Sequence, residues 1–293
     1  MKNNDLKYWI WFSKLRDISN LKKQKILEKY NSPKELWNKS KQELIKQNFL
    51  NKQEIDYILD KGKRNNLEKY INYMEKNKIN LITIFDEEYP KRLKNLYDKP
   101  LYLFTKGNEE LLNSNNIAIV GTRNCSKYGE DVAKNLSFNL VKNDICIVSG
   151  LANGIDKYAH IGALAGTGKT IAVLANGLDN IYPFENKYLA EKIIEKNGLI
   201  ISEYVIGVKA SKMQFPERNR IISGISDGIV VVEAGEKSGA LITAEFGLEQ
   251  GKEIFAVPGN LNNKNSTGTN QLIKDGANII TSFKDVLYTC YKI

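Results

Sequence analysis

Residue types that carry classical catalysis or metal binding are scarce in this sequence of 293 residues. Histidine occurs once, as His160, and the three cysteines, Cys125, Cys146 and Cys290, lie far apart in no metal-binding spacing. No apolar run approaches the roughly 18 residues of a membrane span. We therefore expect reduced thiols, a cytoplasmic location, no membrane anchor, and neither a metal cluster nor a nucleophile–base pair.

Arginine is scarce as well, since six of the 43 basic residues are arginine and the others are lysine. Arg123, Arg218 and Arg220 fall in two loop motifs of the second part of the chain. The planar guanidinium binds phosphate with two parallel hydrogen bonds, so these positions indicate phosphate contacts; a structural ion pair is the alternative for each. The net charge of +9 also favours a polyanionic partner, and it is concentrated in residues 1–115, with 24 basic against 16 acidic residues.

What the sequence does contain is a series of six short apolar runs, each ending at a glycine or a small polar turn. Helix-like stretches separate the runs, a pattern that predicts parallel strands buried on both faces. We predict an α/β fold in which residues 81–293 form a Rossmann-like, doubly wound, mostly parallel sheet. In such sheets ligands bind beyond the carboxyl ends of the strands. The runs are 117–120, 145–148, 171–175, 199–201, 229–232 and 254–257.

Residues 1–80 are predicted to form a small, all-helical domain, similar to SAM or helix-hairpin-helix modules. Such a module either contacts nucleic-acid backbones or docks a partner protein, and both alternatives stay open. Ser32, before Pro33, and Ser40 are expected helix starts, and 81–84 is expected to be an edge strand. The helical spacing covers residues 6–15, 21–30 and 51–77, and the expected core side chains are Trp9, Trp11, Leu36, Trp37, Leu44 and Phe49.

The first two candidate phosphate sites are turns at strand ends. Gly121-Thr122-Arg123 precedes a helix predicted over 128–142, so a close backbone approach, a helix dipole and a cation coincide there. The segment from Ser149 to Asp156 carries glycines at 150 and 154, but it does not match the dinucleotide fingerprint. We therefore expect no bound cofactor and interpret it as a tight turn with amides available to an anion. A plain turn is the alternative reading of the first motif.

Three further segments complete the candidate set. Ser238-Gly239 at a helix start offers amides and a hydroxyl to a phosphate, with simple capping as the alternative. Arg218 and Arg220 must point to different sides of a helix, and we expect Arg218 and Asn219 to face the crevice. Tyr182 and Phe184 are suited to stacking on bases while Lys187 meets a phosphate, or to packing.

One segment imitates a phosphate-binding P-loop without its context. Residues 163–170 read A-L-A-G-T-G-K-T, but they follow a predicted helix and open a strand. A P-loop has the reverse order, so we interpret this segment as a helix end.

Together these segments resemble the DNA processing protein A family, also called Smf. The resemblance covers about residues 80 to 280, and residues 1–80 resemble the family's small helical domain more loosely. It rests on seven ordered motifs, which include I-A-I-V-G-T-R-N-C-S-K-Y-G-E, F-P-E-R-N-R-I-I-S-G-I-S-D and V-V-V-E-A-G-E-K-S-G-A-L-I-T-A. The motifs span 117–130, 147–160, 170–183, 215–227, 230–244, 256–260 and 266–277.

The resemblance implies a Rossmann-like domain that binds single-stranded DNA without strong sequence preference. It further implies protection of incoming strands in natural transformation, loading of the RecA recombinase onto them, a homodimer, and no catalytic chemistry. Arg123 and Lys187 look like phosphate-binding residues, and Gly121, Arg218 and the Ser238-Gly239 turn look like parts of one basic pocket. The expected DNA-binding residues are Gly121, Thr122, Arg123, Gly150, Asn186, Lys187, Arg218, Asn219, Ser238 and Gly239.

Two other functions stay open at this point, and one departure from the family is expected. Related sheets serve nucleotide-hydrolysing enzymes, for which Glu245 is the candidate acid or base. A scaffold that docks a partner through residues 1–80 is the third reading. The sequence ends soon after Tyr288, so we expect no C-terminal winged-helix domain, which some family members carry.

Overall fold

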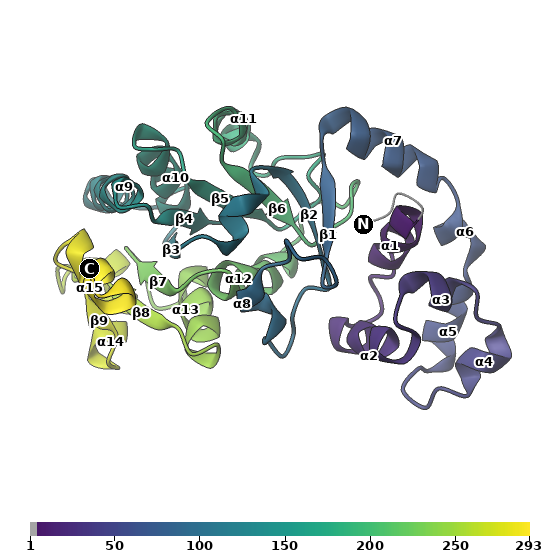
Figure 1. The fold of residues 1–293 in the computed structure, drawn as a ribbon. Coiled ribbons are helices and arrows are strands. Elements are labelled where there is room, and N and C mark those ends of the chain that lie inside the picture. Colours follow the sequence, from purple (N-terminus) through teal and green to yellow (C-terminus); the bar gives the residue numbers. More distant parts are fainter. Residues whose placement is uncertain (1–4) are drawn as a thin grey trace.

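The computed structural model describes residues 5–293 and contains one nine-stranded sheet in the order β1-β2-β6-β5-β4-β3-β7-β8-β9 (Figure 1). In this order, each strand from β6 through β5, β4, β3, β7 and β8 to β9 runs parallel to its neighbours. At the other edge, β2 pairs antiparallel with β6, and β1 pairs antiparallel with β2. The six predicted strands are all present within one residue of their expected limits. The strands are β1 Asn80–Thr83, β2 Tyr102–Gly107, β3 Asn116–Val120, β4 Cys146–Ser149, β5 Thr170–Leu174, β6 Leu199–Ser202, β7 Gly228–Val231, β8 Glu253–Ala256 and β9 Asn278–Ile279.

Helices cover both faces of the sheet, which confirms the doubly wound α/β prediction (Figure 1). One face is covered by α9 (Lys127–Lys142), α10 (Ile155–Ala165) and α11 (Lys187–Glu195). The other is covered by α8 (Lys91–Lys94), α12 (Gln214–Gly224) and α13 (Gly239–Glu249). The chain finishes with α14 (Thr267–Lys274) and α15 (Phe283–Tyr291).

The strand order reverses at β3. From β3 the sheet grows through β4, β5 and β6 in one direction, and β7 then returns to the other side of β3. The crevice at the carboxyl ends of β3 and β7 is therefore the topological switch point, where ligands bind in open α/β sheets.

Residues 5–77 form helices joined by turns, and the helical spacing over 51–77 is interrupted twice. Asp60 caps a new short helix through the amide of Gly62, and Asn66 adopts a left-handed backbone with φ 59°, so the segment forms three helices. Ser32 and Ser40 cap helices as predicted. The helices are α1 Leu6–Ser13, α2 Asn20–Tyr30, α3 Pro33–Trp37, α4 Lys41–Ile45, α5 Lys52–Leu59, α6 Lys61–Arg64 and α7 Leu67–Asn77.

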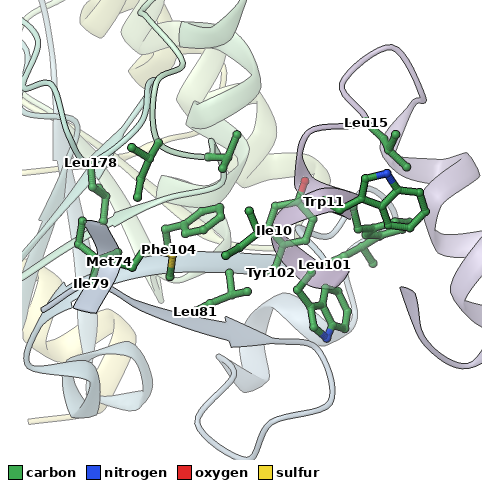
Figure 2. Packing of buried hydrophobic residues seen from close by; sticks show 14 of the residues in the cluster. Ile10, Trp11, Leu15, Met74, Ile79, Leu81, Leu101, Tyr102, Phe104 and Leu178 are labelled. Carbon is green, nitrogen blue, oxygen red and sulfur yellow. The ribbon is translucent and has the colours of Figure 1, made fainter. Parts of the chain in front are cut away.

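These helices share a hydrophobic core with the edge of the sheet. Ile10 of α1 lies in one cluster with Tyr102 and Phe104 of β2 (Figure 2). Trp9 and Phe12 present ring edges to Tyr102, with centroids 6.2 and 6.5 Å away. Of the predicted core residues, Trp37 and Phe49 are only partly buried and the other four are buried. A domain limit at residue 80 stays a prediction, and its first four residues lie outside the described part of the chain.

One further expectation is resolved by the backbone. The P-loop-like segment is a helix end, since α10 stops at Ala165, Gly168 has φ 85°, and β5 begins at Thr170. Within residues 5–293, no helix is long and apolar enough to cross a membrane.

Candidate nucleic-acid interface

A cavity of about 590 Å³ opens at the switch point, between the turns that follow β3 and β4 and the starts of α12 and α13. It gathers seven of the ten residues predicted from the sequence, although their motifs are spread over more than a hundred positions. Gly150 lines a smaller adjoining hollow of about 50 Å³. The seven residues are Gly121, Thr122, Arg123, Arg218, Asn219, Ser238 and Gly239.

The mouth of this cavity combines an exposed cation with aromatic rings. The Arg123 guanidinium lies 4.9 Å from the centre of the Phe215 ring, and that ring lies 5.8 Å from Tyr182, which is 47% exposed. Within residues 5–293, no carboxylate lies within 4.0 Å of Arg123. An arginine held on a ring keeps its charge and its donors available to an anion, and exposed rings offer stacking faces to bases.

Arg218 lines the cavity, but the prediction that it faces outward is wrong, because it is buried and already hydrogen-bonded. Its Nη1 donates to the carbonyl oxygens of Gly150, at 2.7 Å, and of Val173. Burial lowers the pKa of Arg218 to about 10. Arg220 points to the other side of α12, where Glu203 and Asp98 bind it, which confirms that the two arginines diverge.

The amides of the Gly150 turn are not free, which corrects the prediction that they await an anion. The Asp156 carboxylate accepts from the Gly150 amide at 3.1 Å and also from the Ala152 amide. Burial raises the pKa of Asp156, while Arg218 and these amides act against the rise. A Cβ at position 150 would lie 2.4 Å from Nη1 of Arg218, so the glycine makes room for the guanidinium.

The start of α9 is occupied in the same way. The Glu233 carboxylate accepts from the amide and hydroxyl of Ser126, at 2.8 and 2.5 Å, and the Glu233 carbonyl accepts from the Thr122 amide at 2.7 Å. The predicted phosphate site on this helix dipole is therefore wrong, because an internal carboxylate already fills it. Arg123 is the group of this turn that remains available.

The start of α13 differs because it is open. Ser238 caps the helix, as the alternative reading of this turn has it, by accepting from the Ala240 amide at 3.4 Å, and a Cβ added at Gly239 would meet nothing within 4 Å. Asn219 supports the turn by donating from Nδ2 to the Gly239 carbonyl at 3.2 Å. This helix start lines the cavity. The amides of Ser238, Ala240 and Leu241 already donate within the turn, at 3.0, 3.4 and 3.0 Å, so the Gly239 amide is the one left for a phosphate.

Asn186 and Lys187 do not line this cavity. Asn186 is buried and donates to the Leu151 carbonyl at 2.9 Å and to Asn153 at 3.2 Å, so it fixes the turn after β4. Lys187 lines a separate hollow of about 490 Å³ next to α7, with its Nζ 6.0 Å from the Phe184 ring. Lys187 therefore lies apart from Arg123, and its contact with a phosphate stays a prediction.

Comparison with known proteins agrees with this geometry. The family model of DNA recombination-mediator protein A matches residues 80–290. The chain belongs to this family. DNA processing protein DprA of Streptococcus pneumoniae is 46% identical over 205 residues, covering 70% of this chain and 72% of the relative. DprA of Bacillus subtilis is 46% identical over 209 residues, covering 71% and 70%.

Two solved structures of the DNA recombination-mediator protein A family are similar to the whole fold or to its sheet. DprA from S. pneumoniae superposes with a TM-score of 0.77 at 37% identity, covering 97% of this chain and 98% of the other. DNA processing protein A from Helicobacter pylori, described for its single-stranded DNA binding mode, gives 0.65 at 34% identity, covering 72% and 96%. The first match extends through the helical part.

The sequence did not identify every residue that shapes the site. Lys212 lines the cavity but lies in a loop with no distinctive pattern, and Phe215 meets Arg123 only through the tertiary fold. His160 is buried, with Nδ1 2.8 Å from the Thr170 hydroxyl, and burial lowers its pKa to about 3. Glu245, the acid of the nucleotide-hydrolysis alternative, is exposed on α13 and does not line the cavity.

Proposed function

We propose that this protein binds single-stranded DNA in the switch-point cavity. In line with the family resemblance, it would act in the cytoplasm during natural transformation, as a homodimer that protects incoming strands and loads RecA onto them. Membership of the DNA recombination-mediator protein A family supports the mediator role, and the H. pylori relative supports the single-stranded ligand.

The observation that carries the proposal is the Arg123 guanidinium stacked on Phe215 beside the exposed Tyr182 ring. Arg123 and Lys212 supply charge at the mouth for backbone phosphates, and the start of α13 supplies the Gly239 amide. The rings accept any base, because every base has a stacking face. Recognition through phosphates and stacking predicts binding with little sequence preference.

The test is fluorescence anisotropy with labelled single-stranded and duplex DNA across a salt series. The logarithm of the binding constant for the single strand should fall linearly with the logarithm of the salt concentration. The slope should be about −0.7 for each phosphate contact. Arg123→Ala should weaken binding and reduce that slope. Lys169→Ala is the matched control, because Lys169 pairs with Asp144 at the opposite, amino-terminal edge of the sheet.

Equal binding by Arg123→Ala and the wild type, with both folded, would place the DNA elsewhere. Absence of single-strand binding at any salt would overturn the proposal. RecA loading is tested separately, by whether the protein accelerates RecA filament formation on the same strand.

A further inference from the structure

The net positive charge of the chain lies entirely in its helical part, residues 1–80. Residues 1–80 contain 19 basic and 10 acidic residues, whereas residues 81–293 contain 24 of each. Residues 81–293 therefore have no net charge, and in the proposed function they attract phosphate through individual cations such as Arg123. The net charge of +9 attracts a polyanion mainly towards the helices.

Within the helical part, cations gather where α5, α6 and α7 meet. We call Lys14, Lys61, Lys63 and Arg64, with the rings of Tyr57 and Tyr70, the basic corner. Among the described residues, no carboxylate lies within 4.0 Å of its four cations. Asp60, the acid between α5 and α6, accepts from the Gly62 amide at 2.7 Å. Other lysines of this part are paired, for example Lys39 with Glu43 at 3.2 Å and Lys41 with Asp56 at 2.6 Å.

Aromatic rings lie beside three of the four cations of the basic corner. The Lys63 ammonium lies 3.7 Å from the centre of the Tyr57 ring, and Lys14 lies 5.1 Å from Tyr70 while donating to the Lys63 carbonyl at 2.8 Å. The Arg64 guanidinium stacks 4.4 Å from Trp37, with its Nε and Nη2 buried, so Arg64 belongs to the packing of the corner rather than to its accessible charge. Rings orient a cation without neutralising it, so Lys63 presents its positive charge on the Tyr57 ring, and the exposed Lys61 adds a second charge from the same short helix. That combination is typical of sites for single-stranded nucleic acid.

The basic corner also leads towards the switch-point cavity. Tyr57 lines a cavity of about 610 Å³ between the α1–α2 turn and α12, together with Arg16, Tyr204 and Glu217. The Arg16 guanidinium lies 5.8 Å from the Tyr204 ring, which repeats the pairing of cation and ring. Glu217 directly follows Pro216, which lines the switch-point cavity. The two cavities therefore meet at neighbouring residues of α12. The cavity beside Tyr57 is also lined by four carboxylates, those of Asp17, Asp98, Glu203 and Glu217.

We propose that the basic corner is a second binding surface for the same DNA strand, taking the phosphates of nucleotides that extend beyond the switch-point cavity. This inference rests on the proposed single-stranded DNA binding. It assigns the helical part a direct role in holding the strand and makes affinity dependent on strand length.

The experiment compares single strands of about 4 and about 16 nucleotides, the limits of a single-strand-binding module's site size. The variant is Lys61→Ala with Lys63→Ala, which leaves Arg64 packed on the tryptophans. The control, Lys39→Ala with Lys41→Ala, removes the same charge from the same helical part. The variant should bind the longer strand several-fold more weakly, with a salt slope smaller by about 1.4, because two contacts are lost.

The shorter strand should bind the variant and the wild type equally, and Lys61→Arg with Lys63→Arg should restore the longer strand's affinity. Thermal melting confirms that each variant is folded. Equal loss in the control pair, or unchanged binding of the longer strand, would overturn the basic corner while leaving the switch-point cavity intact. If the wild type bound neither strand, the proposed function itself would fail, and this inference with it.

Discussion

Arg218 and Arg220 show how far a single residue's role depends on the fold. Their spacing on a helix predicts that they diverge, and they do. It does not predict that Arg218 donates to the carbonyls of Gly150 and Val173, because those acceptors lie on strands distant in sequence. The candidate site therefore divides into Arg123, which is exposed, and Arg218, which is fixed beneath it.

Lys23 gives a prediction at the same scale. It is buried, its Nζ donates to the Tyr102 hydroxyl at 3.3 Å, and burial lowers its pKa from 10.5 to about 8. The folded protein thus binds fewer protons than the unfolded chain between pH 8 and 10.5, and stability rises with pH across that window. Lys23→Met should therefore stabilise the protein at neutral pH, by about 3 kcal/mol at most.

Urea denaturation of the wild type and Lys23→Met across that pH range checks this prediction. The difference in unfolding free energy should shrink as the pH rises, because the wild type then loses its buried charge. A difference that stays constant with pH would mean that Lys23 is not desolvated in the folded protein.

Among the elements, the two helix starts at the cavity look alike in sequence and differ in the structure. Both follow a strand and a small polar residue, so both were expected to bind phosphate. The start of α9 is closed by Glu233, which comes 107 residues later than Ser126 in the chain. Local sequence cannot reveal such a distant partner, whereas the apolar runs that define the strands are local and were predicted correctly.

Ser126 provides the prediction for this element. Its hydroxyl caps α9 by accepting from the Gly129 amide at 3.1 Å, and it donates to Glu233. Ser126→Ala should reduce the unfolding free energy by about 1 to 2 kcal/mol, as expected for a lost helix cap. Ser126→Thr is the control, because it keeps the hydroxyl. An alanine variant as stable as the wild type in urea would show that the cap and the Glu233 contact contribute nothing measurable.

For the whole molecule, the sequence predicts the α/β class and the six central strands because buried parallel strands are continuous apolar runs. It does not predict the division of residues 51–77 into three helices, which depends on Asp60 and Asn66 overriding a regular helical pattern. Nor does it predict that the helices and the sheet edge share one core, since Trp9 and Tyr102 are far apart in the chain.

Trp9 tests how the two parts of the molecule depend on each other. It is 4% exposed, and its ring lies 5.9 Å from Phe12 and 6.2 Å from Tyr102. Trp9→Ala should cost about 3 to 5 kcal/mol, typical of a large aromatic removed from a core. Because the lost contacts bridge α1 and β2, hydrogen exchange should accelerate in both elements, and urea should still produce one transition.

Trp37→Ala is the comparison, since the ring of Trp37 contacts Trp11 and Tyr8 inside the helical part. Its effect on hydrogen exchange should stay within the helices. If Trp9→Ala instead left β2 protected and produced two separate transitions, residues 1–80 would fold as an independent domain. DNA held at both the basic corner and the switch-point cavity would then couple two bodies that move separately, rather than lie along one rigid surface.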